Sequence, residues 1–497
     1  MSDFTELVDL ASERVGGIVL GANDEFFAPK ENLLRASQPI FIEDKYTDRG
    51  KWMDGWETRR RREPGHDWAI IRLGLPGVIR GVVVDTSHFK GNYPAQCSIE
   101  GCATEHLSSL ETLASAPWVE ILPPCDLKGD TQNHLAIGSP YRFTHVRLNI
   151  FPDGGVARLR VYGEVLPDWK ELASAKEIDL AAVENGGLVR EASDMFFGSR
   201  HNLILPGPAR NMGDGWETKR RRGPGYDWAI VELGTEGVVR RIEVDTSHFK
   251  GNFPESCSVE GCQADGVTLD RAEWKELLPR RKLKADTRHV FESELREAGS
   301  VTHLRLNIFP DGGVARFRAY GQVTSEGRLA AGVRAFNALP EPPAEAALLA
   351  SCGSKNWARE ALKRRPFRSV DALRRAADEV WRKLGREDWL EAFGAHTRIG
   401  EETSGKKGAK AQEWSKQEQA GTRGASEKLL VELREANREY EKRFGYIFVV
   451  CATGKTAEEM LALLRQRLQN EPGKELMVAA EEQRRIVQLR LEKMLTG

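Results

Sequence analysis

The stretch RLNIFPDGGVAR, Arg147 to Arg158, occurs a second time without any change at Arg305 to Arg316. The stretch DTSHFKGNYP, Asp85 to Pro94, also returns, as DTSHFKGNFP at Asp245 to Pro254. Both copies lie about 160 residues further along the chain, which is the length of a whole domain and not of a solenoid unit. The sequence therefore predicts that one domain has been duplicated.

A third pair of stretches extends the duplication and helps to set its limits. DGWETRRRREPGHDW, Asp54 to Trp68, matches DGWETKRRRGPGYDW, Asp214 to Trp228. We expect the first repeat at residues 15–166 and the second at residues 187–325. The segment between them, residues 167–186, contains DWKELASAKEIDLAAVEN and is predicted to form a connecting helix.

Each repeat has the pattern of an antiparallel β domain. Runs such as WAIIRLG, VIRGVVVDT, THVRLNIF and ARLRVYGEV are rich in β-branched residues, and turns containing Gly, Pro and Asn separate them. Many short strands divided by such turns are typical of a sandwich or barrel. The sequence thus predicts two homologous antiparallel β-sandwich domains of the jelly-roll kind.

The last part of the chain, residues 333–497, has a different pattern. Stretches such as VDALRRAADEVWRKL and AEEMLALLRQRLQ place apolar residues three and four positions apart, as on one face of a helix. An all-α domain is therefore predicted. LPEPPAEAA, Leu339 to Ala347, is expected to be the junction, because prolines stiffen a linker and can open a helix.

The composition argues against several classes of protein. With 73 Lys and Arg against 74 Asp and Glu, the chain has no overall field that would attract nucleic acid or an anionic membrane. No apolar run approaches the roughly 20 residues of a spanning helix. The acidic start, MSDFTELVDLASERVGG, does not resemble a signal peptide. We expect a cytoplasmic homo-oligomer that acts on small molecules and has neither nucleic acid nor membrane as a partner.

The seven cysteines are predicted to be thiols and not a disulfide scaffold. Cys97 and Cys102 recur as Cys257 and Cys262, which raises the possibility of a metal site. Five positions along a strand lead to opposite faces, however, and this spacing is not a usual zinc pattern. Packed core thiols are the favoured interpretation.

Polar residues follow the strand-like runs of each repeat, where loops on a rigid scaffold usually carry binding groups. Turn chemistry accounts for Asp85, Thr86 and Gly91. A histidine, a lysine and an amide near arginines instead suit a small carboxylate with ureido arms. The predicted substrate-binding residues are His88, Lys90, Asn92, His248, Lys250, Asn252, Arg147, Arg305, Glu57 and Glu217.

The run from Arg59 to Arg62 has two interpretations. It can form a phosphate or nucleic-acid patch, although stacking aromatics and a basic balance are missing. Along a strand, neighbouring arginines would face opposite sides, so two of the four would pair with Glu57 or Asp67. His66 is replaced by Tyr226 in the second copy. That change favours one productive site, or a site built between unlike halves.

Together the doubled motifs resemble allantoicase, the allantoate amidinohydrolase of purine breakdown. The resemblance covers residues 15–323 and implies two jelly-roll-like domains that convert allantoate and water to ureidoglycolate and urea. Such an enzyme must hold a carboxylate, and must either protonate the leaving urea nitrogen or activate water. A divalent metal at His88, His248 or nearby carboxylates stays open, although no HxH or HExxH spacing supports it.

The helical domain holds a second group of polar residues. GAHTRIGE contains His396, and EWSKQEQAG contains Ser415, Glu418 and Gln419, which share one face of a helix. A capping box, with His396 at a helix end, is an equally good interpretation. GKT lacks the first glycine of a P-loop, so Thr456 is predicted to begin a helix through another capping box.

The motif order of this domain resembles the decarboxylase of 2-oxo-4-hydroxy-4-carboxy-5-ureidoimidazoline. GSKNWA, H-x-RIGE, WSKQEQAG, RFGYIFVVCA and VQLRLEKML occur in the order of that family, which is all-helical, needs no cofactor and yields (S)-allantoin. The resemblance implies the catalytic residues His396 and Glu418, the substrate-binding residue Arg490, and the accessory contacts Ser415 and Gln419.

The chemistry expected from this resemblance is coherent. Loss of CO2 needs an oriented carboxylate, an electron sink in the ring and a proton donor for the carbanion. Arg490 would orient the substrate, while His396 and Glu418 would exchange protons. One position departs from the family, because Thr397 stands where proline is usual. A looser backbone at His396 would lower the decarboxylase activity.

The chain is thus predicted to be a bifunctional enzyme of purine catabolism, a hydrolase joined to a cofactor-free carboxy-lyase. An alternative is that the β repeats are non-catalytic carbohydrate-binding or scaffolding modules, since a fold does not determine a function. Such modules usually present stacking aromatic residues at loop tips. The doubled His, Lys and Arg residues favour the hydrolase.

Overall fold

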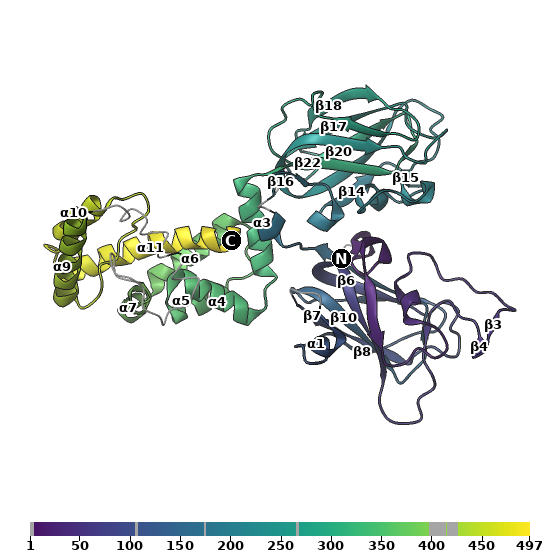
Figure 1. Ribbon diagram of the computed structural model, residues 1–497, viewed down its shortest axis with the longest axis horizontal. Coiled ribbons are helices and arrows are strands. Elements are labelled where there is room, and N and C mark those ends of the chain that lie inside the picture. Colours follow the sequence, from purple (N-terminus) through teal and green to yellow (C-terminus); the bar gives the residue numbers. More distant parts are fainter. Residues whose placement is uncertain (1–3, 105–107, 173–174, 265–267, 397–413, 415–425) are drawn as a thin grey trace. The chain divides into compact units, whose positions relative to one another are not determined.

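The computed structural model describes residues 4–104, 108–172, 175–264, 268–396, 414 and 426–497 (Figure 1). The chain divides into two compact units, Met1–Arg328 and Leu329–Gly497. The first unit contains two antiparallel eight-stranded sheets, one in each repeat, and the second is helical. The predicted fold class is therefore confirmed. No helix in the described part of the chain is both long and apolar enough to cross a membrane.

The two repeats have matching strands. Those of the first repeat are β1 (Val8–Asp9), β2 (Ile18–Ala22), β3 (Tyr46–Thr47), β4 (Gly50–Lys51), β5 (Trp56–Glu57), β6 (Asp67–Asp85), β7 (Gln96–Cys102), β8 (Val119–Asp126), β9 (Gln132–Ala136), β10 (Arg142–Phe151), β11 (Gly155–Val156) and β12 (Arg158–Val165). Those of the second are β13 (Ile178–Asp179), β14 (Leu188–Ala192), β15 (Trp216–Glu217), β16 (Asp227–Asp245), β17 (Ser256–Cys262), β18 (Lys275–Lys282), β19 (Arg288–Phe291), β20 (Val301–Phe309), β21 (Gly313–Val314) and β22 (Arg316–Val323).

One long strand organises each repeat. The first part of β6 pairs with β2 and β10, whereas its last part pairs with β12 and β9. The strand β16 has the same partners in the second repeat, namely β14, β20, β22 and β19. Because its two halves join different strands, the long strand links two layers that pack face to face. Apolar side chains from both parts, such as Ile71 and Val82, are fully buried between them.

The unchanged PDGG turn packs directly on the HFKGN loop. A methyl group added to Gly155 would lie 2.0 Å from the ring of Phe89, and one added to Gly154 would lie 2.7 Å from the backbone nitrogen of Pro94. The N–H of Gly155 also donates to the carbonyl of Asn92 over 2.7 Å. The two repeated motifs are therefore the two halves of one contact, which explains why both recur.

The expected connecting helix between the repeats is wrong. Among the described residues of this segment, only Trp169–Leu172, labelled α2, is α-helical, and β13 pairs with β22 just as β1 pairs with β12. The segment IDLAAVENGG, residues 178–187, is in fact the copy of VDLASERVGG, residues 8–17. Pairing with the sheet and burial of Leu180 outweigh its local helical periodicity. Both repeats therefore include strands ahead of their predicted starts.

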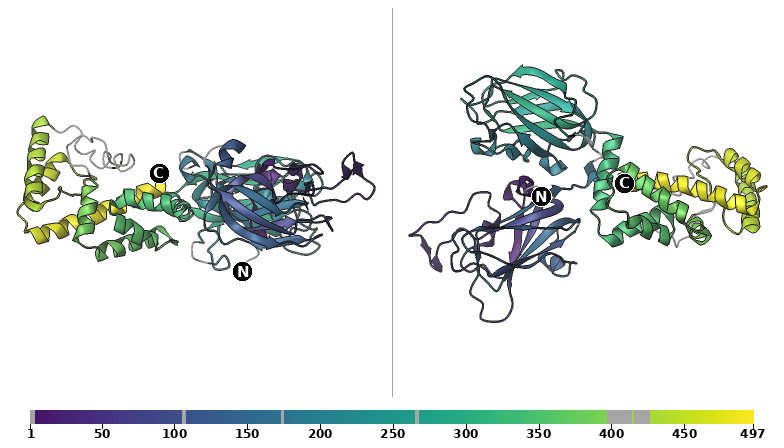
Figure 2. Two further views of the ribbon diagram at one scale, coloured as in Figure 1. Left: turned by 90° about the horizontal axis from the view of Figure 1, so that it is seen from below. Right: turned by 180° about the vertical axis from the view of Figure 1, so that it is seen from behind.

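The second unit consists of helices packed around one apolar core. Its helices are α3 (Ser325–Asn337), α4 (Glu341–Cys352), α5 (Lys355–Leu362), α6 (Val370–Lys383), α7 (Arg386–Gly394), α9 (Glu427–Phe444), α10 (Ala457–Arg467) and α11 (Pro472–Thr496), while a short α1 (Leu110–Ala114) belongs to the first repeat. Figure 2 shows α11, in yellow, running the length of this unit between the remaining helices.

Local signals start and stop these helices as expected. Thr456 accepts a hydrogen bond from the N–H of Glu459, whose side chain accepts one from the N–H of Thr456, so the predicted capping box is confirmed. The prolines of LPEPPAEAA open α4 and do not form an interdomain junction, because α3 already begins at Ser325, soon after β22. The described cysteines are all free, as predicted, and Cys97, Cys102 and their copies are buried.

The close contact of the PDGG turn supplies a stability test in the second repeat. A methyl group on Gly313 would lie 1.9 Å from the ring of Phe249, whereas one on Gly251 would meet nothing within 4 Å. We expect Gly313→Ala to lower the free energy of unfolding by about 1–3 kcal/mol through overpacking, and Gly251→Ala to change it little. Guanidinium denaturation followed by tryptophan fluorescence measures both, and equal midpoints for the two variants would contradict the packing account.

Candidate active sites

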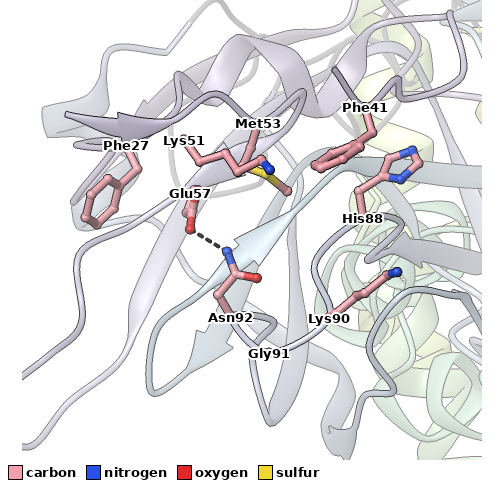
Figure 3. Close-up of a pocket in the computed structure, with 9 residues that line it drawn as sticks. All are labelled: Phe27, Phe41, Lys51, Met53, Glu57, His88, Lys90, Gly91 and Asn92. Carbon is pink, nitrogen blue, oxygen red and sulfur yellow. Dashed lines mark hydrogen bonds between the residues drawn. The ribbon is translucent and has the colours of Figure 1, made fainter. Parts of the chain in front are cut away.

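A pocket of about 380 Å³ opens in the first repeat (Figure 3). We call it the first-repeat pocket. Its lining residues are Phe27, Phe41, Lys51, Met53, Glu57, His88, Lys90, Gly91 and Asn92. The structure thus brings together four of the side chains that the sequence singled out, namely Glu57, His88, Lys90 and Asn92.

Glu57 and Asn92 are hydrogen-bonded to each other in the lining of the pocket. The amide Nδ2 of Asn92 donates to Oε1 of Glu57 over 2.6 Å. Glu57 lies on β5, which pairs with β11 at the PDGG turn, and Asn92 is held by the N–H of Gly155 on the same strand. The turn therefore determines the position of both side chains.

The carboxyl group of Glu57 has a shifted pKa. Burial raises its pKa above the ordinary value of 4.5, and the hydrogen bond from Asn92 opposes that shift. A carboxylate whose pKa is raised by burial, and which accepts one hydrogen bond, is suited to accept a proton from water. No such shift occurs at an ordinary exposed surface carboxylate, because solvation there resembles that of a model peptide.

His88 is held in an unusual backbone conformation. Its φ is +71°, a left-handed value that is uncommon for residues other than glycine, and its N–H donates to Asp130 over 2.8 Å. Its ring Nε2 lies 3.3 Å from the carbonyl oxygen of Pro39, and Phe41 stacks on the ring at 5.7 Å. Since a carbonyl only accepts, Nε2 is the donor in this hydrogen bond.

Two lysines give the pocket positive charge. Lys51 comes from the β3–β4 hairpin and lies 4.7 Å from the centre of the Phe41 ring. Lys90 follows His88 and reaches Asp130 only at 4.0 Å, with its side chain 80% exposed. Glu57 carries the single carboxylate among the lining residues. The lining is therefore suited to an anion with hydrogen-bonding arms.

The second repeat keeps these motif residues but lacks one wall. Asn252 donates to Glu217, and the N–H of His248 donates to Asp286 at 2.7 Å, as in the first repeat. The β3–β4 hairpin has no counterpart, because Leu34 and Asp54 are 20 positions apart whereas the matching Ile204 and Asp214 are 10 apart. Figures 1 and 2 both show this hairpin standing away from the sheets.

Without a counterpart of that hairpin, apolar side chains of the second repeat are exposed to solvent. Phe197 matches the pocket residue Phe27 and is 62% exposed, and the neighbouring Phe196 is 71% exposed. Lys250, the counterpart of Lys90, is exposed as well. The second repeat therefore presents the polar residues of the site without its enclosing hairpin.

The predicted arginines lie elsewhere. Arg147 on β10 forms an ion pair with Glu100 at 2.6 Å and covers the ring of Trp118. Arg305 repeats this arrangement with Glu260. Neither arginine lines the first-repeat pocket, so the structure does not place a carboxylate-binding arginine there.

The run from Arg59 to Arg62 is not a strand, contrary to expectation. Arg59 pairs with Asp24 and not with Glu57. The chain leaves β5 after Glu57, and Arg59 lies beside the loop that carries Asp24. The expected pairing with Asp67 is made by Arg61, at 2.8 Å. Two of the four arginines thus have structural partners.

The exchange of His66 for Tyr226 does not distinguish the two sites. His66 lies 4.9 Å from Phe151 with an interplanar angle of 41°, and Tyr226 has the same distance and angle to Phe309. Either ring performs the same packing role, outside the pocket. The asymmetry between the repeats comes from the hairpin.

The repeated motifs do not include three further pocket residues, namely Phe41 ahead of the β3–β4 hairpin, Lys51 on β4 and Met53 after it. Comparing the copies only where they match hides an insertion, whereas the unequal spacing of the flanking matches reveals it. In the described residues, no group of three His, Cys, Asp or Glu side chains is arranged to hold a metal ion.

The helical unit contains the second candidate site. Arg490 on α11 is 1% exposed, and its guanidinium Nη2 lies 3.4 Å from Nδ1 of His396, which follows α7. Two residues predicted to act together therefore meet. Ser415, Glu418, Gln419 and Thr397 lie outside the described residues.

The RFGYIFVVCA motif contributes buried side chains near this second site. Tyr446, Phe448 and Val449 are each less than 9% exposed, and Tyr446 lies 5.4 Å from the ring of Phe393 on α7. This apolar surface lies close to the helix end that carries His396. An apolar wall beside a buried arginine suits an anion that must lose its solvation.

Both units are similar to known protein families. A family model described as allantoicase repeat matches residues 8–166 and 178–324, and one described as OHCU decarboxylase matches residues 337–492. An allantoicase of Dictyostelium discoideum is 50% identical over 320 residues, which cover 63% of this chain and 86% of that protein. A probable allantoicase of Burkholderia mallei is 49% identical over 319 residues, with 63% and 94% covered.

A solved structure agrees with these matches. The crystal structure of an allantoicase from Saccharomyces cerevisiae has 40% sequence identity and a TM-score of 0.55. The similarity covers 64% of this chain and 93% of the yeast chain. The similar region corresponds to the two β repeats.

Proposed function

Because the chain belongs to the allantoicase family through its two repeats and carries an OHCU decarboxylase domain at residues 337–492, we propose that its reactions occur in the first-repeat pocket and around His396. The chain is a bifunctional enzyme of the allantoin pathway, a hydrolase joined to a lyase. The alternative of non-catalytic β modules is not favoured. The gathering of Glu57, His88, Lys90 and Asn92 in one pocket carries the proposal.

The first-repeat pocket is proposed to bind allantoate. Its volume of about 380 Å³ lies in the range of small-molecule sites. Lys51 and Lys90 supply positive charge for the carboxylate of the substrate. The ureido arms carry N–H donors and carbonyl acceptors, which complement Nδ1 of His88 and the side chain of Asn92.

Glu57 is proposed as the general base. Asn92 orients the carboxylate through one oxygen, and the other accepts a proton from water. The water oxygen then bonds to the carbon that carries both ureido groups, and the bond from that carbon to one ureido nitrogen breaks. The proton taken by Glu57 passes to the leaving nitrogen, so the products are ureidoglycolate and urea.

The second reaction is assigned to the helical unit. Arg490 orients the carboxylate of the ureidoimidazoline substrate, and His396 and Glu418 transfer the proton that replaces CO2. The product is (S)-allantoin. We propose that this step needs no cofactor. Whether the hydrolase requires a metal is tested by measuring urea release with and without a chelator.

Location and assembly are proposals of the same kind. The balanced charge of the chain supports small ureido substrates, and not nucleic acid or membrane, as partners. We propose a cytoplasmic enzyme that forms homo-oligomers. The neighbouring exposed side chains of Met195, Phe196 and Phe197 support a surface for self-association.

Glu57 and its copy Glu217 give a matched test of the hydrolase site. We expect Glu57→Gln to lower kcat for urea release from allantoate about 10²- to 10⁴-fold, as for loss of a general base, and Glu217→Gln to leave it nearly unchanged. Only ionised Glu57 accepts a proton, so activity should fall with decreasing pH, with a midpoint above 4.5. Equal losses in the two variants would contradict a single working repeat.

Two lysines of the same hairpin test its role in binding. Lys51 lines the pocket, whereas Lys45 lies over the ring of Trp52 at 3.8 Å and does not. Loss of a charged contact should make Lys51→Ala raise KM for allantoate roughly 10-fold with a smaller effect on kcat. Lys45→Ala is the control, and a KM increase of the same size in both variants would argue against substrate contact by Lys51.

His396→Ala separates the two activities. We expect it to abolish detectable decarboxylation, measured by the appearance of (S)-allantoin in circular dichroism, because the substrate loses a proton-transfer partner. Urea release by the same preparation should stay unchanged and shows that the β repeats are intact, while the melting temperature of the helical unit is the folding control. Full decarboxylase activity in this variant would show that the assignment of His396 is wrong.

A further inference from the structure

His396 is held from one side by α11. Its N–H donates to the carbonyl of Phe393 at the end of α7, and its ring Nδ1 faces the guanidinium of Arg490 at 3.4 Å. Arg490 is almost completely buried, so it has little freedom to move. The position of α11 therefore affects the position of the imidazole ring.

The turn between α4 and α5 packs on the residue before His396. Gly353 ends α4 with φ of +90°, in the left-handed region that favours glycine. A methyl group at Gly353 would lie 2.4 Å from Cβ of Ala395 and 3.2 Å from the carbonyl oxygen of Ala392. Since Cβ atoms do not approach so closely, only glycine lets this turn lie against Ala395.

The same turn is joined to α11. Gln483 is fully buried, and its Nε2 donates to the carbonyl of Cys352 over 3.0 Å. Gln483 and Arg490 are seven residues apart, about two helical turns, and so lie on the same side of α11. That helix thus contacts His396 directly through Arg490, and indirectly through the turn at Cys352 and Gly353.

We propose that Gly353 and Gln483 are positioning residues for His396 in decarboxylation. The proposal rests on the catalytic role assigned to His396. Gly353 lets the turn support the end of α7, and Gln483 keeps the turn in register with the helix that carries Arg490. Small displacements of a catalytic group reduce turnover strongly, because productive geometry is lost while substrate still binds.

A matched pair of glycines tests the role of Gly353. Gly454 lies in the same unit with φ of +79°, and a methyl group there would meet nothing within 4 Å. Alanine strains the backbone at both positions, but only Gly353→Ala pushes on Ala395. We expect its kcat for decarboxylation to fall about 10- to 100-fold with little change in KM, whereas Gly454→Ala keeps kcat.

Three further variants separate positioning from stability. Gly353→Ala combined with Ala395→Gly removes the methyl group that is struck, and should recover most of the lost kcat. Gln483→Leu removes the amide donor and should lower kcat. Gln483→Glu keeps an acceptor but has no amide donor, so its kcat should be lowered as well. Melting temperatures followed by circular dichroism report the stability of the helical unit, and urea release reports intact chain.

The outcomes are distinct. Equal kcat loss in Gly353→Ala and Gly454→Ala, or no recovery in the double variant, overturns the positioning role while leaving His396 catalytic. Full activity of His396→Ala overturns both assignments. A kcat loss confined to Gly353→Ala and Gln483→Leu, with recovery in the double variant, supports the proposal.

Discussion

The contact between the PDGG turn and the HFKGN loop is the constraint on which the hydrolase site depends. Two adjacent glycines lie where any side chain would strike Phe89 or the backbone near Pro94. Their strand, β11, then pairs with β5, which carries Glu57, and donates to the carbonyl of Asn92. A close approach of two backbones, possible only with glycine, thus sets the distance between the two polar side chains that face each other in the pocket.

The same contact exists in both repeats, so it does not by itself decide where catalysis occurs. The difference is the insertion that contains the β3–β4 hairpin. It adds Lys51 on β4 and, ahead of β3, Phe41, which stacks on His88. In the second repeat Phe197, the counterpart of the pocket residue Phe27, is exposed. Duplication has preserved the turn that organises the fold, and an insertion has distinguished one copy from the other.

Much of this arrangement could be predicted from the sequence, for identifiable reasons. Repeated motifs identified the duplication and the loop residues His88, Lys90 and Asn92, since identical loops imply identical supporting contacts. Local periodicity identified the helical unit because its helices are long and capped.

Other features depend on long-range contacts that local patterns do not contain. Arg147 carries the same chemical signal as a binding arginine, and only the fold shows that Glu100 neutralises it. The false connecting helix has the same cause, because pairing of β13 with β22 decides its structure.

One measurement tests the central claim most directly, a crystal structure of Glu57→Gln at saturating allantoate. The account predicts density for one allantoate per chain, in the first-repeat pocket beside Lys51 and Lys90. A second molecule of equal occupancy between His248 and Asn252 would contradict it.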